Sequence, residues 1–362
     1  MLPVDARMLA AVPNTDLRVR VEHRNRNQHR PLWNLNWAKR PLLIYGAGIR
    51  HCREEAAELA MLLDVPIAPT WGAMDMFPES ERSIGSFGTH GKRSANLAIQ
   101  SSDWILAVGT RLDTKAMGTP PTLFAPQAKK WAVDIDQGEL EKFERMGVSV
   151  IGICEEAKEW LQRRIEGVRN SPDGPHYFTD WQAQIAAWKA EYPLPKAEHY
   201  EAIAAISSIS TEEDVICCDT GLILPWMMRA FRFKGQRFLH PWNQTPMGYA
   251  VPAAVGAHYA TGKRVIVVTG DGSIMMNIGE LATIAERNLP IKIFLFDNKG
   301  YGMVQQTQRQ WFDGRYVASD TASLSFPNFE RVAEAFGVDM TVIDIDPDAE
   351  LEDQVMFGEA LA

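Results

Sequence analysis

Short runs of apolar, β-branched residues alternate with helix-like patterns along most of this 362-residue chain. Runs of this kind predict buried strands, and the longer stretches between them, with apolar residues three or four positions apart, predict helices. A regular alternation of strand and helix is typical of a parallel sheet covered by helices. In the first half of the chain the predicted strands are residues 41–45, 65–70, 104–108, 131–135 and 148–151.

The second half repeats this alternation after a change in composition. Residues 167–196 are polar and contain four prolines around a helical pattern with Trp181, Ile185 and Trp188, which indicates a domain boundary. Beyond it, strands are predicted at 214–218, 265–268, 291–296 and 340–345, with helices at 225–231 and 253–259. We therefore expect an α/β protein with two doubly wound parallel-sheet domains, the first of them Rossmann-like.

One stretch, residues 265–304, places polar side chains at the ends of two predicted strands. Gly270-Asp271-Gly272-Ser273 follows the first strand, and Asp297-Asn298-Lys299-Gly300 follows the second. A right-handed crossover brings two such strands side by side, so Asp271 and Asn298 are expected to face one pocket. A carboxylate and an amide carbonyl are hard oxygen donors that suit Mg²⁺ or Ca²⁺. The glycines would let backbone N–H groups approach phosphate oxygens, and the serine would add a hydroxyl.

A glycine–aspartate–glycine run by itself usually marks only a boundary between a strand and a turn. Here a second polar cluster follows after one further buried strand, at the distance along the chain that a shared site requires. The pairing of the two clusters therefore favours a site for a metal ion and a diphosphate over a plain turn.

Composition narrows the classes of function. The formal net charge of −9 disfavours a nucleic-acid partner or an anionic membrane, since both need a basic surface. The basic segment 17–40, which contains Trp33 and Trp37, is expected to be a solvated linker on a partner surface. Four cysteines without a CxxC pair indicate buried thiols in a reducing compartment. The sequence has no signal-peptide pattern and no apolar run of membrane-spanning length, so we expect a soluble, cytoplasmic protein.

The two polar clusters resemble the signature of thiamin-diphosphate-dependent enzymes, in which GDGS is followed, after a helix, by an asparagine next to a turn. The resemblance implies that the Asp271 carboxylate, the Asn298 side chain and the main-chain carbonyl of Gly300 hold Mg²⁺. In that family the metal bridges the two phosphates of thiamin diphosphate. The family usually has two asparagines at the second cluster, and Asp297 stands at the first of these positions. This departure implies additional negative charge near the metal.

The segment NQTPMGYAVP, residues 243–252, leads into a predicted apolar helix. From the residues alone, Met247 between a proline and a glycine is a core gap-filler. The resemblance implies another role, because a bulky apolar residue at this place in the family lies under the cofactor and bends it. Thr245 would then offer its backbone carbonyl to the 4′-amino group of the pyrimidine. The same resemblance places further cofactor contacts at Thr220, Gly221, Gly248, Gly270, Gly272, Ser273, Gly302 and Met303.

Longer motifs resemble the acetohydroxyacid (acetolactate) synthase branch of that family, whose central domain binds FAD. They include TPMGYAVPAAVGAHYA in the second half and GSFGTHGKRSANLAIQSSDWILAVGTRLD in the first. Arg111 would pair with the FAD diphosphate, whereas His90 is either a FAD contact or an ordinary loop histidine. Some family members with this domain carry no FAD or bind ADP, and Cys154 replaces the usual Gly-Asp, so the FAD assignment stays open. The positions implied for FAD are Gly48, Gly88, His90, Gly109, Arg111 and Asp113.

Two further departures from that branch change the expected substrate class and domain organisation. Leu222 and Ile223 stand where a Gly-Gln-His run usually contacts the diphosphate, which leaves the substrate class open. From the resemblance we expect that the N-terminal domain with the catalytic glutamate of the family lies outside this chain, and that the final strand after 340–345 is missing from it. The expected organisation is a linker from the missing domain at 1–37, a central nucleotide- or FAD-binding domain at 38–166, a linker at 167–196 and an incomplete thiamin-diphosphate-binding domain at 197–362.

The resemblance thus implies a split subunit or fragment of a thiamin-diphosphate- and Mg²⁺-dependent carboligase or decarboxylase of 2-keto acids such as pyruvate. We expect it to be inactive alone, to need a separate polypeptide with the glutamate domain and to form a homo- or hetero-oligomer. Two alternatives stay open. One is a related lyase, hydrolase or acyltransferase on another keto substrate, and the other is a noncatalytic, cofactor-binding regulatory protein.

Overall fold

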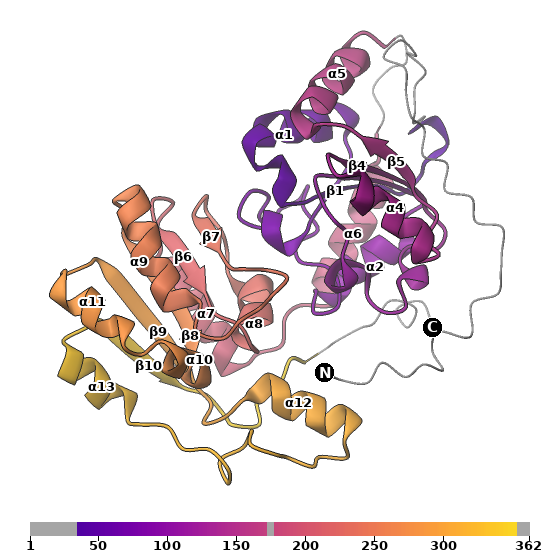
Figure 1. The fold of residues 1–362 in the computed structure, drawn as a ribbon. Helices are drawn as coiled ribbons and strands as arrows, with labels where there is room; N and C mark the ends of the chain where they lie inside the picture. Colours follow the sequence, from indigo (N-terminus) through magenta and orange to yellow (C-terminus); the bar gives the residue numbers. More distant parts are fainter. Residues whose placement is uncertain (1–34, 172–176, 353–362) are drawn as a thin grey trace.

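The computed structural model of the protein describes residues 35–171 and 177–352. Two five-stranded parallel sheets, each flanked by helices, form two domains that lie next to each other (Figure 1). The first domain is coloured from indigo to magenta in Figure 1, and the second ends in yellow. The predicted fold class, an α/β protein with two doubly wound parallel sheets, is confirmed. The expected linker at 1–37 lies almost entirely outside the described residues, as does the end of the chain after residue 352.

The first sheet has the strand order β2-β1-β3-β4-β5. The chain leaves β1 toward one edge of the sheet and then returns to build β3 on the other side of β1. This reversal opens a crevice at the carboxyl ends of β1 and β3, which is where such sheets bind ligands. The strands are β1 (Pro41–Tyr45), β2 (Ile67–Pro69), β3 (Trp104–Val108), β4 (Lys129–Asp134) and β5 (Ile151–Cys154).

The last strand of this sheet begins later than the sequence pattern predicts. β5 pairs with β4 from Ile151, opposite Trp131, and not from Val148. Gly147 has a positive φ of 67° and closes the turn after the preceding helix, so the residues that follow approach the sheet before they pair with it. Val148 and Val150 are still buried in the core, which explains the apolar pattern of this stretch.

The second sheet has the order β10-β9-β8-β6-β7, with its reversal between β6 and β8. The sequence pattern does not predict β7, because only three residues pair and Arg237 at its start is exposed. Between β8 and β9 the chain forms two short helices, α10 (Asp271–Met276) and α11 (Glu280–Glu286), where the pattern predicts one. The strands are β6 (Val215–Cys218), β7 (Arg237–Leu239), β8 (Val265–Gly270), β9 (Ile291–Asp297) and β10 (Met340–Asp344).

The remaining helices lie around the two sheets (Figure 1). Within residues 35–171 and 177–352, no helix combines the length and the apolar character that crossing a membrane requires. The first domain contains η2 (Leu35–Trp37), η3 (Ala47–Cys52), α1 (Arg53–Leu63), η4 (Trp71–Ala73), α2 (Arg93–Ser101), α3 (Thr114–Met117), η5 (Pro121–Leu123), α4 (Gln137–Arg145), α5 (Ala157–Arg169) and α6 (Thr179–Glu191). The second contains α7 (Glu198–Ile209), α8 (Ile223–Ala230), α9 (Ala250–Thr261), α12 (Gly302–Trp311) and α13 (Phe329–Phe336).

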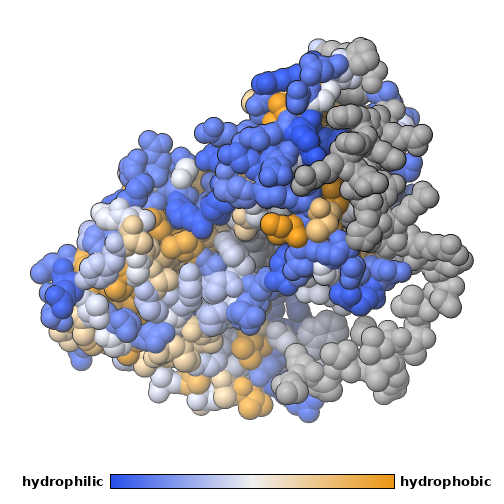
Figure 2. Space-filling view, turned by 45° about the horizontal axis from the view of Figure 1, so that its top comes forward, coloured by the Kyte–Doolittle hydropathy of each residue, from blue (hydrophilic) through white to orange (hydrophobic). Residues whose placement is uncertain are grey.

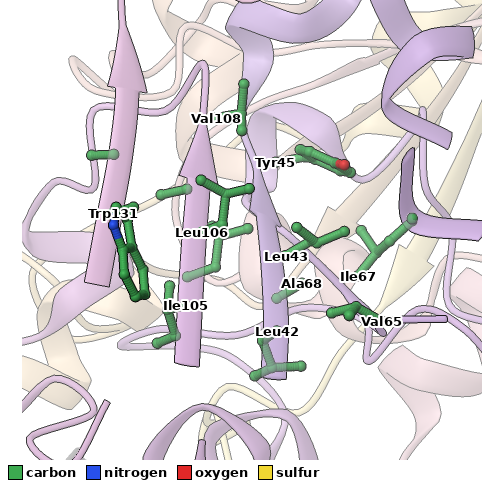
Figure 3. Close-up of a cluster of buried hydrophobic side chains, with 14 of the residues drawn as sticks. Leu42, Leu43, Tyr45, Val65, Ile67, Ala68, Ile105, Leu106, Val108 and Trp131 are labelled. Atoms are coloured by element: carbon green, nitrogen blue, oxygen red, sulfur yellow. The ribbon is translucent and has the colours of Figure 1, made fainter. Parts of the chain in front are cut away.

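The central strands of both sheets are buried on their two faces. All five residues of β1 are buried, and Figure 3 shows Leu42, Leu43 and Leu106 among side chains of the neighbouring strands. In the second domain, alternate residues of β8 belong to two separate cores, with Val267 in one and Val268 in the other. Burial on two faces is the reason why these strands read as continuous apolar runs in the sequence.

Part of the expected linker 167–196 packs into the first core. The indole N–H of Trp181 in α6 donates to the carbonyl of Pro41 at 3.0 Å. Trp181 and Ile185 are both buried with the side chains of the first sheet. The helix α6 therefore belongs with the first domain, because its apolar face is covered by that domain's core.

A buried arginine joins the two domains. Arg229 in α8 is 3% exposed, and its guanidinium donates to the carbonyl groups of His90 at 3.0 Å and Gly91 at 2.8 Å in the first domain. In the opposite direction, the Asp75 carboxylate of the first domain accepts the backbone N–H of Phe238 at 3.0 Å. These contacts hold α8 and β7 against the first domain.

The close approach of two turns in the first sheet gives a stability prediction. A β-carbon on Gly46 would lie 2.3 Å from the carbonyl oxygen of Gly109, so Gly46→Ala requires a backbone shift. We expect this variant to lower the free energy of unfolding by about 3 kcal/mol. The matched control is Gly167→Ala in α5, where a β-carbon meets nothing within 4 Å and is expected to stabilise by up to about 1 kcal/mol. Urea denaturation measures both, and wild-type stability of Gly46→Ala would contradict the close approach.

Candidate functional site

Four loops of the second domain leave the carboxyl edge of its sheet. β6 is followed by the turn 219–222 and β9 by the turn 298–300. β8 runs directly into α10, so the turn 270–273 consists of the last residue of β8 and the first turn of α10. The fourth loop, residues 240–249, connects β7 to α9. All the strands of this sheet run parallel, so these loops meet at one edge, around the strand reversal between β6 and β8.

The Asp271 carboxylate joins the turns after β8 and β9. Its Oδ2 accepts the backbone N–H of Gly300 at 3.1 Å, and its Oδ1 accepts that of Gly272 at 2.5 Å. Asp271 is 2% exposed, and burial raises the pKa of its carboxyl group to about 7, with the negative charge of Asp297 acting in the same direction. The structure thus brings together the two loop tips that the sequence pattern pairs.

Asn298 lies beside Gly302 and Leu222 at the same edge. A β-carbon on Gly302 would come within 2.8 Å of Asn298 Nδ2 and within 2.6 Å of Leu222 Cδ1. Among the described residues, this buried Nδ2 has no hydrogen-bond partner. A buried amide left without a partner is unfavourable by about 1–3 kcal/mol. A hydrogen-bond acceptor at this position would therefore be stabilising.

These donors fit a hard divalent cation bound next to a diphosphate. Asp271 supplies a buried carboxylate, and a cation beside it would favour the ionised form. Asn298 supplies an amide on the neighbouring turn. A β-carbon on Gly272 would lie 2.2 Å from Cε1 of Tyr301, so only glycine fits at this point of the turn.

Asp297, which is expected to add negative charge near a metal, is paired with a lysine. Its Oδ2 contacts Lys299 Nζ, which also lies 3.2 Å from Oδ1 of Asp344. The Lys299 ammonium group therefore offsets part of the added charge. Asp297 still raises the pKa of the Asp271 carboxyl group, after the larger effect of burial.

Met247 lies against the turn after β8. A β-carbon on Gly272 would be 3.1 Å from Met247 Cε, and Met247 itself is only half-buried. Thr245, two residues earlier, has a φ of 42°, a conformation that is rare for a residue with a side chain. The other expected contacts, Thr220, Gly221, Gly248, Gly270, Gly272, Ser273, Gly302 and Met303, all lie on these loops or at the ends of the adjoining elements.

Comparison with known proteins assigns both domains to one family. Residues 219–358 match the family model described as thiamine pyrophosphate enzyme, C-terminal TPP binding domain. Residues 33–162 match the model of the central domain of thiamine pyrophosphate enzymes. The chain belongs to the thiamine pyrophosphate enzyme family. The resemblance noted from the GDGS and asparagine clusters is thereby confirmed.

Acetolactate synthase large subunits are among the proteins similar to this thiamine pyrophosphate enzyme chain. It is 32% identical over 331 residues to the acetolactate synthase isozyme 1 large subunit of Escherichia coli (strain K12), an alignment that covers 88% of this chain and 57% of that protein. It is 34% identical over 312 residues to the acetolactate synthase large subunit of Parasynechococcus marenigrum (strain WH8102), covering 83% and 49% respectively. The chain spans about half the length of the curated relatives it matches.

The central domain of this thiamine pyrophosphate enzyme chain contains a cavity of about 620 Å³ at its own strand reversal. One side is closed by residues 241–243 of the second domain, which belong to the loop that carries Met247. The sequence gives no local signal for this wall, because it forms only when the two domains pack. Of the positions expected to contact FAD, Gly48, Gly109, Arg111 and Asp113 line the cavity, whereas Gly88 and His90 do not.

The expected phosphate-binding groups of this cavity already have partners. The N–H of Gly48 donates to the carbonyl of Gly109 at 2.9 Å, so these glycines allow two turns to pack closely. The Arg111 guanidinium is 2.7 Å from Glu139 Oε1, and this hydrogen-bonded pairing raises the pKa of Arg111. Oriented to satisfy its neighbours, the Asn243 amide oxygen accepts from Arg111 Nη1 at 2.9 Å. A diphosphate would have to compete with Glu139 for Arg111.

His90 and His240 are histidines enclosed near the domain contact. His90 stacks on Trp71 with a distance of 6.0 Å between ring centroids, and its Nδ1 has no hydrogen-bond partner in the described structure. Within residues 35–171 and 177–352, neither ring nitrogen of His240 has a partner. Burial lowers the pKa of His90 to about 4 and that of His240 to about 3. His90 is not among the residues that line the cavity, but it stacks on Trp71, which is.

These two histidines predict how stability depends on pH. Their pKa values in the folded chain lie below the value of about 6.5 for unfolded histidine, so the unfolded chain binds protons first as the pH falls. Stability is expected to decrease from about pH 6.5 downward, by about 1 kcal/mol per histidine at pH 5.5. His240→Gln should therefore show a smaller loss between pH 7.5 and 5.5 than the wild type in urea denaturation. An identical loss in both proteins would contradict the assignment.

Proposed function

We propose that this protein is a thiamin-diphosphate- and Mg²⁺-dependent carboligase or decarboxylase of 2-keto acids such as pyruvate, acting in the cytoplasm. One observation carries the proposal, namely the meeting of the two polar turns, where Asp271 accepts the N–H of Gly300 at 3.1 Å. The unpartnered Nδ2 of Asn298 on the adjoining turn would donate to an acceptor such as a phosphate oxygen, while its amide oxygen is a hard donor for the metal. Membership of the family supports thiamin diphosphate as the ligand, and the similarity to acetolactate synthases supports the reaction class.

The roles of the residues follow from their positions. Asp271, Asn298 and the carbonyl of Gly300 would hold Mg²⁺ against the diphosphate, while the glycines of the turn 270–273 would let backbone N–H groups reach the phosphates. Met247 would pack beneath the cofactor, and the Thr245 carbonyl would accept from its amino group. When bound, thiamin diphosphate supplies a nucleophilic carbon for the keto group and accepts the electron pair that remains when CO₂ leaves. The chain itself binds, bends and orients the cofactor.

We further propose that a glutamate-bearing domain on a separate polypeptide completes the site in a homo- or hetero-oligomer. Trp311 at the end of α12 is 78% exposed, and Val317 in the loop after it is 72% exposed. Figure 2 shows hydrophobic residues set among hydrophilic ones on one face of the molecule. Large apolar side chains exposed on the helix that follows the Asn298 turn suit a surface that another domain covers. In this arrangement the chain is inactive without that domain.

A second candidate function is that of a related lyase, hydrolase or acyltransferase on another keto substrate. The observation that favours it is Leu222, which is 5% exposed and whose Cδ1 lies beside the same glycine, Gly302, as the Asn298 amide. An apolar side chain at this point offers a substrate no hydrogen bond, so it would select keto substrates by shape. A noncatalytic regulatory protein is the remaining alternative, and the assay below distinguishes it.

We also propose that the cavity of the central domain binds a nucleotide, either FAD or ADP. Its place at a strand reversal and its volume of about 620 Å³ support this ligand class. Arg111 would contact the diphosphate after exchanging its bond to Glu139, while Gly48, Gly109 and Asp113 would line the site. Neither Gly88 nor His90 would take part.

The metal-binding role of Asp271 can be tested by titration calorimetry. Asp271→Asn is expected to weaken Mg²⁺-dependent binding of thiamin diphosphate by about a hundredfold, because loss of groups that merely support a metal ligand already costs about 10- to 100-fold. The matched control is Asp339→Asn, which removes an exposed carboxylate paired with Lys292 on β9 and should keep wild-type affinity. Absence of Mg²⁺-dependent binding in the wild type would contradict the proposed function.

The same three proteins, mixed with a polypeptide that carries the glutamate domain, are then assayed for release of CO₂ from pyruvate and other 2-keto acids. The wild type and Asp339→Asn are expected to release CO₂, and Asp271→Asn is not. Release only from other keto acids would favour the second candidate function. Cofactor binding without release from any substrate would favour the regulatory alternative.

The nucleotide proposal predicts the effect of freeing Arg111. Protein incubated with FAD is expected to retain the visible absorbance of a flavin after gel filtration. Glu139→Gln should bind FAD about fivefold more tightly, because the neutral amide releases Arg111 more easily than the carboxylate does. Titration with ADP separates the two nucleotides. Failure to bind either nucleotide, or equal affinities of the variant and the wild type, would contradict this use of Arg111.

A further inference from the structure

Asp219, directly after β6, accepts hydrogen bonds from three consecutive residues that follow Met247. Its Oδ1 accepts the backbone N–H of Gly248 at 2.9 Å and that of Tyr249 at 3.3 Å, and its Oδ2 accepts that of Ala250 at 3.2 Å. Asp219 is 0% exposed. A fully buried carboxylate therefore holds the segment between the expected cofactor-bending residue and the start of α9.

Two further donors fix the carboxylate itself. The hydroxyl of Thr269, which immediately precedes Gly270 at the end of β8, donates to Asp219 Oδ2 at 3.1 Å. The backbone N–H of Thr220 donates to Oδ1 at 3.2 Å. Asp219 thus links the end of β6, the end of β8 and the start of α9. Its position is tied directly to the strand that leads into the metal-binding turn.

Gly248 is held from its other side as well. The Asn277 side chain, at the end of α10, donates from Nδ2 to the Gly248 carbonyl at 2.7 Å. Gly248 has a φ of 83°, and a β-carbon there would lie 2.6 Å from Cβ of Met276. Gly248, the residue after Met247, is therefore fixed through its N–H by Asp219 and through its carbonyl by the far end of the helix that begins at Asp271.

The choice of a carboxylate follows from the number of donors. Five donors converge on the two oxygens of Asp219, and an ionised carboxylate offers about four lone-pair positions and no proton. An asparagine would offer one oxygen and would turn an NH₂ group toward N–H or O–H donors. Among the described residues, Asp219 has no ion-pair partner, so its negative charge is satisfied by hydrogen bonds alone.

We propose that Asp219 is a positioning residue. By holding the backbone of residues 248–250, it fixes the position of Met247 beneath the thiamin rings. The inference rests on the proposed function, since it takes Met247 as the residue that contacts the rings. Asp219 acts through the loop, and within the described structure its carboxylate accepts no hydrogen bond from the turns 270–273 and 298–300. Its loss should therefore weaken the binding of the rings and spare the binding of the diphosphate.

Two ligands separate these parts of the site. The affinity for magnesium pyrophosphate depends only on the part of the site around Asp271 and Asn298. The affinity for magnesium thiamin diphosphate also depends on the part that contacts the rings. In the full chain, Asp219→Asn is expected to weaken binding of magnesium thiamin diphosphate at least about tenfold, equivalent to about 1.4 kcal/mol. Its affinity for magnesium pyrophosphate should stay within about twofold of the wild type. Thr269→Val removes a single hydrogen bond to the carboxylate. It should lower the affinity for magnesium thiamin diphosphate relative to that for magnesium pyrophosphate, but by less than Asp219→Asn does.

The matched control is Asp214→Asn at the opposite end of β6. Asp214 is 3% exposed, accepts the N–H of Thr211 at 2.7 Å and pairs with Arg264 at 2.7 Å. It is therefore another buried carboxylate bound to main chain, but at the edge of the sheet away from the site. Asp214→Asn should lower the melting temperature as Asp219→Asn does and leave the affinities for both ligands unchanged.

The outcomes separate this inference from the proposed function. If the ratio of the affinities for magnesium thiamin diphosphate and magnesium pyrophosphate is the same in the wild type and Asp219→Asn, the inference is overturned and the cofactor assignment stays intact. An equal loss for both ligands makes Asp219 a purely structural residue and also overturns it. If the wild type binds both ligands with equal affinity, Met247 does not contribute to binding of the rings, and the inference is overturned. If the wild type binds neither ligand, the proposed function is overturned. If Asp219→Asn does not fold, Thr269→Val decides by the same comparison.

Discussion

The site depends on a hydrogen bond between the turns of two neighbouring strands, in which Asp271 accepts the N–H of Gly300 at 3.1 Å. β8 and β9 pair in parallel along most of their length, so their carboxyl ends reach the same edge and their turns lie side by side. Burial there raises the pKa of the Asp271 carboxyl group, and a bound cation would restore its charge. The glycine at 272 follows from the same constraint, because a side chain would collide with Tyr301.

The loop between β7 and α9 connects this site to the cavity of the central domain. On the cavity side, Lys115 donates to the Trp242 carbonyl at 2.8 Å, and Trp242 forms part of the cavity wall. On the other side, Asp219 accepts the N–H of Gly248 at 2.9 Å. Both domains therefore hold the short segment that carries Met247, and a ligand in the cavity would lie against one end of it.

Much of this organisation could be predicted from the sequence, because strands buried on both faces read as continuous apolar runs. Residues 41–45 and 104–108 coincide with β1 and β3, and the polar turns after β8 and β9 are marked by glycine and acidic residues. The remaining features depend on partners far along the chain. Asp219 bonds residues 29 to 31 positions later, and Arg111 pairs with Glu139 28 positions later, which no local pattern encodes. The three-residue β7 is too short for its own signal.

The most direct test of the account is to locate the metal. Crystals of the chain grown with Mn²⁺ in place of Mg²⁺ and with thiamin diphosphate would show the ion by its anomalous scattering. One peak is expected between the Asp271 carboxylate and the Asn298 side chain, in contact with the diphosphate. A peak elsewhere, or bound thiamin diphosphate without an ion between these two residues, would contradict it.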